Sequence, residues 1–391
     1  MNILNEKKLF QHFRNFEKAI SSYTFDIPFS RFLTQFYKEN KQMGSSDRRM
    51  NTRLCYNYFR LGKALFHLDL IERLVVAEFL VEEESNFVLF HKPEWNAYQQ
   101  ETLENKLAFL QEKGYTILPH NFPFVEELSS SIDEKAFLIN QFTQPDLFLR
   151  LKRGHEKEVY QEFDRFSISF TKLSDQAVSL QNGTNLQQFK NLQGKFEVQD
   201  LSSQRTLDFI KAQEGESWWD CCAASGGKAL MMLDKAPTID LLVSDIRLSI
   251  LRNLDERFDN ASIKRPYRKK IIDLTKSPSL ILKDELFDGI VLDAPCSGSG
   301  TWGRTPEMIS IFKKQDIKYY SDLQKTIARN VIGHLKKGQP LVYITCSVFR
   351  EENEEVVAYM VDKLGLTLEQ KKLLKGYDIH ADSMFVARLI K

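Results

Sequence analysis

Two cysteines in the last third of the chain stand in turns that could bring their thiols into one pocket. Cys296 follows Asp293 by three residues in VLDAPCSGSG, where a proline stiffens the turn, and Cys346 is the last residue but one of LVYITCS. Both segments read as buried strands, and turns at the carboxyl ends of parallel strands face one crevice. A positioned thiolate can act as a nucleophile. A free cysteine is more often a small buried hydrophobe, which is the interpretation we keep for Cys55 and Cys221.

A glycine-rich turn and two carboxylates indicate a nucleoside site. The turn ASGGK follows the strand-like SWWDCC, and its glycines let backbone N–H groups approach a carboxylate or phosphate. It matches neither GxGxxG nor GxxxxGK[ST], so neither a dinucleotide nor a nucleoside triphosphate is favoured. Asp245 ends the next strand, where it could accept hydrogen bonds from a ribose, and Asp273 ends the one after, where it could hold an adenine amino group. Either carboxylate alone could equally be a helix cap, but together with the turn they predict an adenosine site.

The elements that must position these residues alternate between strands and helices from Phe196 onward. This alternation predicts a parallel, doubly wound α/β sheet, and MFVARLI (384–390) predicts an added antiparallel edge strand. Residues 1–142 carry apolar side chains at helical spacing, which predicts a helical bundle. Residues 143–205 predict a small α+β domain, because FLRLKRG alternates like a strand and EKEVYQEF reads as a helix. We therefore expect three domains, the last at 206–391.

Composition excludes several classes of protein. With 42% apolar residues the 391-residue chain is not disordered, and its length predicts more than one domain. No apolar run approaches ~18–20 residues and the N-terminus lacks an uninterrupted apolar stretch, so we expect neither a membrane span nor a signal peptide. Five cysteines fit free thiols in a reducing cytoplasm, and without CxxC spacing no zinc site is expected.

The net charge of +1 argues against a generally basic, nucleic-acid-coating surface. Local basic clusters can still bind phosphates, although most lysines and arginines simply face solvent. The clusters are Arg48, Arg49 and Arg53; Arg150, Lys152 and Arg153; and Lys264, Arg265, Arg268, Lys269 and Lys270.

DCCAASGGK, DAPCSGSG and ITCS resemble the S-adenosylmethionine-binding and catalytic motifs of the RNA 5-methylcytosine methyltransferases of the RsmB/Nop2/Sun family. FEVQDLSSQ resembles the sequence before the cofactor domain in that family, and LRLKRG resembles the start of its small RNA-contacting domain. The helical N-terminus is similar to the NusB-like domain of the bacterial ribosomal-RNA branch, but the resemblance is strong only over residues 145–391. It implies a Rossmann-like, class I methyltransferase fold and a cytoplasmic enzyme.

The resemblance also implies roles for individual residues. Cytosine C5 is a poor nucleophile, and a thiolate that adds to C6 activates it. By this resemblance Cys346 is the nucleophile, Cys296 assists loss of the C5 proton and release of the product, and Asp293 holds cytosine N3 and the amino group. The base must leave any helix to be reached, so the expected substrate is single-stranded or opened RNA, with ribosomal RNA preferred. The residues implied to hold S-adenosylmethionine are Cys222, Ala223, Ala224, Ser225, Gly226, Gly227, Lys228, Asp245, Asp273 and Asp293.

Two departures from the family pattern and three alternatives stay open. Ser225 stands where the family usually has proline, which could loosen the cofactor turn because proline fixes φ, and Asp382–Phe385 replaces the usual Asp-Gly-Phe-Phe. One alternative is a tRNA substrate, and another is a non-catalytic RNA-binding ribosome-assembly factor with the same fold. In the third alternative Cys296 is the nucleophile, as in DNA cytosine methyltransferases, whose attacking cysteine follows a proline.

Overall fold

The computed structural model describes residues 6–263 and 267–391, so Lys264 and Arg265 of the third basic cluster lie outside the described residues. The chain forms two compact units. We call the first the helical unit; it contains the residues up to Glu126, Asp133–Gln144 and Trp302–Lys313. We call the second the sheet unit; it contains Glu127–Ile132, Pro145–Thr301 and Lys314–Lys391.

The helical unit is built from amphipathic helices, as the apolar spacing predicts. Asp69 and Thr102 begin two of them as caps, because their side chains accept hydrogen bonds from backbone N–H groups of the first turn. The apolar faces enclose one core that includes Phe16, Phe29 and Phe79. The elements are α1 (Glu6–Ser22), α2 (Phe29–Glu39), α3 (Ser45–Arg60), α4 (Leu70–Val81), α5 (Asn86–His91), η1 (Pro93–Tyr98), α6 (Leu103–Glu112), α7 (Glu134–Asn140) and α14 (Met308–Ile311).

A segment from late in the sequence belongs to this helical unit. Trp302 is buried, and its ring lies 5.6 Å from that of Phe122 and 4.9 Å from that of Phe312. The buried guanidinium of Arg60 donates to the carbonyl oxygen of Gly303 at 3.1 Å. The chain therefore enters the helical unit six residues after Cys296.

The sheet unit begins with a small antiparallel sheet in the order β2-β3-β1-β4. Val159 and Phe163 of α8 bury their side chains in the core on this sheet, which explains the amphipathic spacing of that helix. The small α+β arrangement agrees with the expectation for this part of the sequence. The elements are β1 (Leu147–Leu151), α8 (Glu156–Arg165), β2 (Phe170–Lys172), β3 (Ala177–Leu180) and β4 (Phe196–Val198).

The larger sheet has seven strands in the order β10-β11-β9-β8-β5-β6-β7. From β9 to β7 neighbouring strands are parallel, and β11 is antiparallel to both of its neighbours. The prediction that 384–390 lies at the edge is therefore wrong, because β10 pairs outside it. The elements are β5 (Ser217–Asp220), α11 (Gly227–Lys235), β6 (Asp240–Asp245), α12 (Leu248–Asn260), β7 (Arg268–Ile271), α13 (Ser279–Leu282), β8 (Gly289–Asp293), α15 (Lys314–Val331), β9 (Pro340–Thr345), α16 (Glu354–Leu364), β10 (Thr367–Leu374) and β11 (Met384–Ile390), with the short helices α9 (Leu201–Arg205) and α10 (Leu207–Ile210) before β5.

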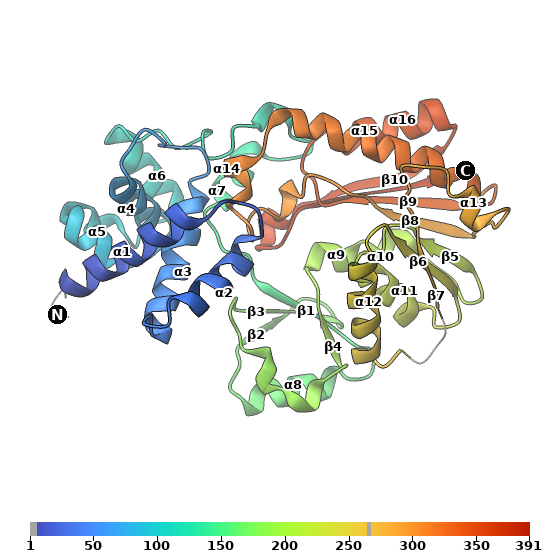
Figure 1. Ribbon diagram of the computed structural model, residues 1–391, viewed down its shortest axis with the longest axis horizontal. Coiled ribbons are helices and arrows are strands. Elements are labelled where there is room, and N and C mark those ends of the chain that lie inside the picture. Colours follow the sequence, from blue (N-terminus) through green and yellow to red (C-terminus); the bar gives the residue numbers. More distant parts are fainter. Residues whose placement is uncertain (1–5, 264–266) are drawn as a thin grey trace. The chain divides into compact units, whose positions relative to one another are not determined.

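Alternate residues of these strands bury two separate cores, one on each face of the sheet. Trp219, Ile290 and Tyr343 face the core beneath α15 and α16. Trp218 and Val291, one position away, face the core beneath α10, α11 and α12. Figure 1 shows these two groups of helices on opposite faces of the sheet. The predicted site residues lie at the carboxyl ends of these strands and in the turns that follow them.

Candidate active site

The structure brings Cys296 and Cys346 together. Strands β8 and β9 are parallel neighbours, with Asp293 paired to Ile344, so the turns that follow them lie side by side. The two sulfur atoms are 3.3 Å apart. Gly300, four residues after Cys296, also bonds to the second turn, because its N–H donates to the Cys346 carbonyl at 2.8 Å. A side chain at this position would crowd the two turns, since an added Cβ would lie 3.0 Å from the same oxygen.

The surroundings of Cys296 favour its protonated form. The hydrogen bond with the Cys346 thiol, burial, and the negative charge of Glu352 all raise the pKa of Cys296 well above its usual value. A thiol that keeps its proton is suited to donate or relay that proton, whereas a nucleophile must give it up.

The glycine-rich turn after β5 has a shape that only glycine can give at position 226. Gly226 has a φ of 82°, and a Cβ on it would lie 2.6 Å from the Phe258 ring. Ala224 also has a positive φ, of 46°. Ala223 donates its N–H to the carbonyl of Ser244 at 2.9 Å, which fixes the turn against β6. The first turn of α11 therefore opens beside the ends of β5 and β6, where backbone N–H groups can meet an anion.

Lys228 links this turn to the cysteine motif. Its ammonium nitrogen lies 3.0 Å from Asp293 Oδ2 and donates to Ser203 Oγ at 2.9 Å. The lysine side chain is 8% exposed and the aspartate 31%. The predicted cofactor lysine and the predicted base-binding carboxylate are thus one ion pair.

Asp220, which sequence reasoning missed, is a buried carboxylate at the end of β5. Neither of its oxygens has a hydrogen-bond partner by distance and angle, although the Ala229 N–H is near enough to favour the charged form slightly. Burial and the Asp293 carboxylate raise the pKa of Asp220 to about 8, against the opposing effect of Lys228. Its place directly before CCAASGGK at a strand end was the signal available in the sequence.

The two other predicted carboxylates have partners of their own. Asp245 Oδ1 accepts from Arg247 Nε at 3.0 Å, and Oδ2 accepts from Arg247 Nη2 at 3.2 Å. Asp273 stands two residues beyond β7, and its Oδ1 accepts from the hydroxyl of Thr275 at 2.6 Å. Both carboxylates lie at the carboxyl ends of strands. Asp245 is paired with an arginine side chain, whereas Asp273 is bonded within its own turn.

The remaining predicted residues line the turn itself. Cys222 is half-buried, whereas Cys221 is fully buried and faces the core. Ser225 Oγ accepts from Arg257 Nη1 at 3.3 Å. Gly227 begins α11, close to the same arginine.

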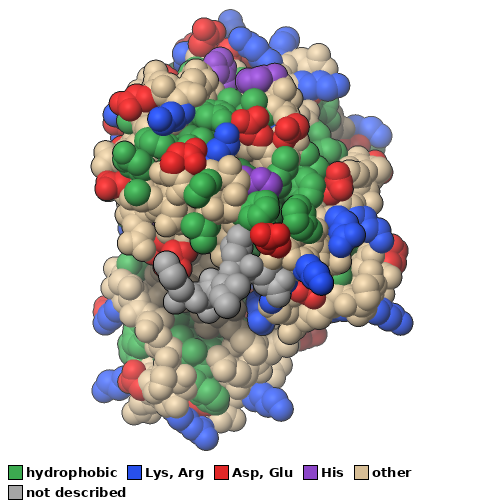
Figure 2. Space-filling model, turned by 90° about the vertical axis from the view of Figure 1, so that its left-hand side faces the viewer, with side chains coloured by type: hydrophobic (Ala, Val, Ile, Leu, Met, Phe, Trp, Pro, Cys, Tyr) green, Lys and Arg blue, Asp and Glu red, His purple; other side chains and the backbone are tan. Residues whose placement is uncertain are grey.

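Several residues of the predicted basic clusters have internal partners. Arg150 is buried and paired with Asp234, and Lys152 donates to the carbonyl of Ala261 at 3.1 Å. Arg268 pairs with Asp240 at 3.1 Å. Side chains of both signs are interspersed on the face in Figure 2, in keeping with the small net charge.

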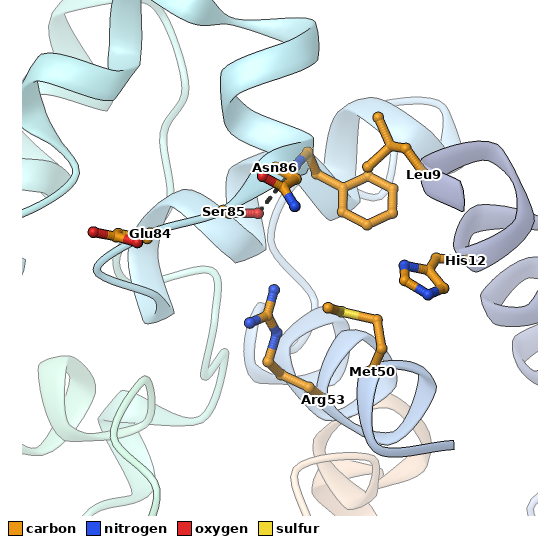
Figure 3. Close-up of a pocket in the computed structure, with 8 residues that line it drawn as sticks. Leu9, His12, Met50, Arg53, Glu84, Ser85 and Asn86 are labelled. Atoms are coloured by element: carbon orange, nitrogen blue, oxygen red, sulfur yellow. Dashed lines mark hydrogen bonds between the residues drawn. The ribbon is translucent and has the colours of Figure 1, made fainter. Parts of the chain in front are cut away.

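A cavity of about 220 Å³ lies within the helical unit (Figure 3). It is lined by side chains of α1, α3 and the start of α5, including His12 and Arg53. Arg53 already pairs with Glu78 at 2.7 Å, so its charge is compensated. The lining contains none of the predicted site residues.

The described residues contain neither a membrane-crossing helix nor a metal-binding cluster. No helix in this part of the chain has the length and apolar character needed to cross a bilayer. Across 6–263 and 267–391, no three His, Cys, Asp or Glu side chains are grouped so as to hold a metal ion.

The sheet and the site at its carboxyl edge define a Rossmann-like, class I methyltransferase fold, and solved structures agree. PH0851 matches with a TM-score of 0.72 at 20% identity, over 97% of this chain and 98% of its own. The methyltransferase homolog protein from Pyrococcus horikoshii matches with a TM-score of 0.58 at 20% identity, over 73% of this chain and 98% of its own.

The sequence of the last half of the chain is similar to a known family of methyltransferases. Residues 207–389 match the family model described as 16S rRNA methyltransferase RsmB/F. A ribosomal RNA small subunit methyltransferase B from Yersinia pseudotuberculosis is 32% identical over 202 residues, which are 50% of this chain and 46% of that relative. The chain thus spans about half the length of the curated relatives it matches. Residues 207–389 are thus similar to the methyltransferase domain of the RsmB/F family.

Proposed function

We propose that this protein is a cytoplasmic RNA methyltransferase that transfers a methyl group from S-adenosylmethionine to C5 of a cytidine, with ribosomal RNA as the substrate. The observation that carries the proposal is the 3.3 Å separation of the Cys296 and Cys346 sulfur atoms at the ends of neighbouring strands. Two thiols from separate turns can act on one base, one as a nucleophile and one in proton transfer. The family of residues 207–389 supports a methyltransferase.

The chain's own residues would act in sequence. The Cys346 thiolate adds to C6 of the cytosine, and the electron pair of the C5–C6 bond becomes available at C5. The Asp293 carboxylate would hold the ring, and Lys228, whose ammonium lies 3.0 Å from it, would fix that carboxylate in place. After C5 is methylated, Cys296 relays the C5 proton to solvent, giving up its thiol proton as it takes the proton from C5. The electron pair of the C5–H bond re-forms the C5–C6 double bond, and the Cys346 sulfur leaves as a thiolate.

The residues at the sheet edge fit S-adenosylmethionine. When bound, this cofactor supplies an electrophilic methyl group. The two unpartnered oxygens of buried Asp220 could accept hydrogen bonds from its amino group, and the turn at Gly226 leaves room for close approach. Asp245 could accept from the ribose if the Arg247 guanidinium moved away, and Asp273 could hold the adenine amino group. The NSun6 structure from Pyrococcus horikoshii, of similar fold, holds SFG, an analogue of S-adenosylmethionine.

The proposal that the substrate is ribosomal RNA is based on the names of the similar proteins. Those with 32% identity are named as ribosomal RNA small subunit methyltransferases. The proposed target is a cytidine in a single-stranded or opened segment, because a paired base cannot reach thiols in a turn. The arrangement of a helical domain (1–142), a small RNA-contacting domain (143–205) and a methyltransferase domain (206–391) is part of the proposal.

The decisive experiment maps 5-methylcytosine by bisulfite sequencing in total RNA from cells with and without this protein. We expect one ribosomal RNA site to lose its mark and to regain it when purified protein and labelled S-adenosylmethionine are added. Loss of a tRNA mark with an unchanged ribosomal pattern would select a tRNA substrate. RNA binding with no incorporation of label into any RNA would select a non-catalytic assembly factor.

A further inference from the structure

One buried carboxylate, that of Glu352, joins the turns that carry the two cysteines. Glu352 is 0% exposed and lies in the loop before α16. Its Oε2 accepts the Ser297 N–H at 2.9 Å, and its Oε1 accepts the Ser347 hydroxyl at 2.7 Å. Ser297 directly follows Cys296, and Ser347 directly follows Cys346. The Glu352 carboxylate therefore bonds to the residue that directly follows each of the two cysteines.

Further bonds hold Glu352 itself in place. Gln324 of α15 donates from Nε2 to the carboxylate at 3.0 Å and to the Pro295 carbonyl at 3.0 Å. Tyr343 of β9 donates its hydroxyl to the Glu352 carbonyl at 2.6 Å. The hydroxyls of Ser297 and Ser347 also bond each other at 3.2 Å. Both carboxylate oxygens of Glu352 are thus bonded at the centre of a buried network, in which Gln324 Oε1 is the one polar atom without a partner among the groups named here. A buried network whose central group is fully bonded favours a single geometry.

We propose that Glu352 is a positioning residue that fixes the Cys296 and Cys346 turns relative to each other and sets the charge that the Cys296 sulfur meets. Its effect on methyl transfer rests on the proposed function, whereas its effect on the thiols does not. Glu352 touches neither base nor cofactor in this account, because both of its oxygens are used by the protein.

Electrostatics give the direction of the effect on Cys296. The Cys296 thiol lies near Tyr343 of β9 and Tyr320 of α15 and disfavours their charged forms. A backbone bond at Gly298 lowers the pKa of Cys296, whereas two titratable groups, Cys346 and Glu352, raise it. Among them the Glu352 carboxylate disfavours the thiolate by charge repulsion. Burial raises the pKa of Glu352 itself, against the opposing bonds from Ser297, Ser347 and Gln324. At pH values where Glu352 is ionised, removal of its charge should lower the pKa of Cys296 and let it react at lower pH.

The test measures the reactivity of each cysteine in the full-length protein. Wild type, Glu352→Gln and Glu351→Gln are alkylated with iodoacetamide from about pH 6 to about pH 10, and each cysteine is followed by mass spectrometry. Glutamine keeps the shape of Glu352 and removes its charge. Glu351 is the matched control, because its carboxylate acts on the exposed Lys318.

We expect Cys296 of Glu352→Gln to react about threefold faster or more at neutral pH, equivalent to a pKa lowered by about half a unit. Glu351→Gln should match the wild type. A Cys296 profile that is unchanged in Glu352→Gln overturns the inference.

A second variant decides the question if Glu352→Gln does not fold. Ser347→Ala leaves the charge in place and removes the hydroxyl that ties the carboxylate to the Cys346 turn. We expect Cys346 to be alkylated about threefold faster or more, because its turn is released. Unchanged reactivity of Cys346 in this variant would show that the link does not position it.

Methyl-transfer kinetics separate this inference from the proposed function. If wild type methylates RNA, Glu352→Gln should lower kcat, leave the KM for S-adenosylmethionine unchanged, and move the alkaline limit of activity to lower pH. If wild type methylates no RNA, the proposed function fails, and the thiol measurements still decide the role of Glu352.

Discussion

Lys228 Nζ and Asp293 Oδ2 lie 3.0 Å apart, and this ion pair joins the glycine-rich turn to the first cysteine motif. The same ammonium favours the charged form of Asp220, which is buried beside it. One almost buried cation therefore serves two carboxylates at the ends of neighbouring strands β5 and β8. Because burial removes water from these charges, each depends on the others far more than surface charges would.

Loss of the Lys228 ammonium should destabilise the protein. Lys228→Met leaves the Asp220 and Asp293 carboxylates near each other without their cation, and we expect the free energy of unfolding to fall by about 2 kcal/mol. Urea denaturation measures the change. Lys235→Met, at the exposed end of the same helix, should change it by less than about 0.5 kcal/mol. A Lys228→Met variant as stable as wild type would show that the pair contributes nothing.

The stability conferred by Asp220 should depend on pH. Its pKa is raised to about 8 in the folded protein, above its value in the unfolded chain, so its contribution is fully present below about pH 4 and is lost as the pH rises through about 8. Asp220→Asn removes this dependence. Urea denaturation measures the free energy of unfolding of both proteins at about pH 5.5 and about pH 7.5. As the pH is raised between these values, the difference between variant and wild type should shift in favour of the variant by more than about 1 kcal/mol.

Asp288→Asn provides the opposite case. Burial disfavours the Asp288 carboxylate, but bonds from Lys336 and the Ser217 N–H outweigh burial and lower its pKa. Its contribution is therefore constant above its unfolded pKa and is lost only as the pH falls through the lowered value. The free energy of unfolding of Asp288→Asn should therefore differ from that of wild type by the same amount at about pH 5.5 and at about pH 7.5. If Asp220→Asn also differed from wild type by the same free energy of unfolding at both pH values, the raised pKa of Asp220 would be contradicted.

The two cysteines should give different covalent products with RNA. Cys296→Ala should trap a protein–RNA adduct, because addition to C6 proceeds and release does not. Cys346→Ala should form none and lose methyl transfer by about a thousandfold or more. A denaturing gel with labelled RNA and S-adenosylmethionine separates adduct from free protein, and Cys55→Ala in the helical unit is the control. An adduct with Cys346→Ala but not with Cys296→Ala would assign the nucleophile to Cys296.

Restoring the family's proline at position 225 should stabilise the fold. Ser225 precedes Gly226 in the turn, where Pro would restrict the unfolded chain, at the loss of a weak 3.3 Å bond from Arg257. We expect Ser225→Pro to raise the free energy of unfolding by about 0.5–1 kcal/mol. Ser225→Ala, which removes the same bond without restricting φ, should not raise it. A loss of stability in the proline variant would mean that the turn has adapted its backbone to serine.

The sequence alone determined the parts that depend on neighbours along the chain. The alternating strands and helices, the glycine-rich turn, and the placement of Cys296 and Cys346 after buried strands are all short-range patterns, so they could be predicted. The helical character of residues 1–142 and the antiparallel direction of β11 were also predicted from the sequence.

Only the tertiary structure decided which distant segments meet. Strand β10 was missed because most of its residues are exposed and polar, and its pairing put β11 inside the sheet. The unpartnered carboxylate of Asp220, the guanidinium of Arg247 on Asp245, and the bonds from Glu352 to both cysteine turns depend on contacts that no local pattern encodes. Burial and hydrogen bonding are set by the whole fold, and they give these ordinary side chains their particular chemistry.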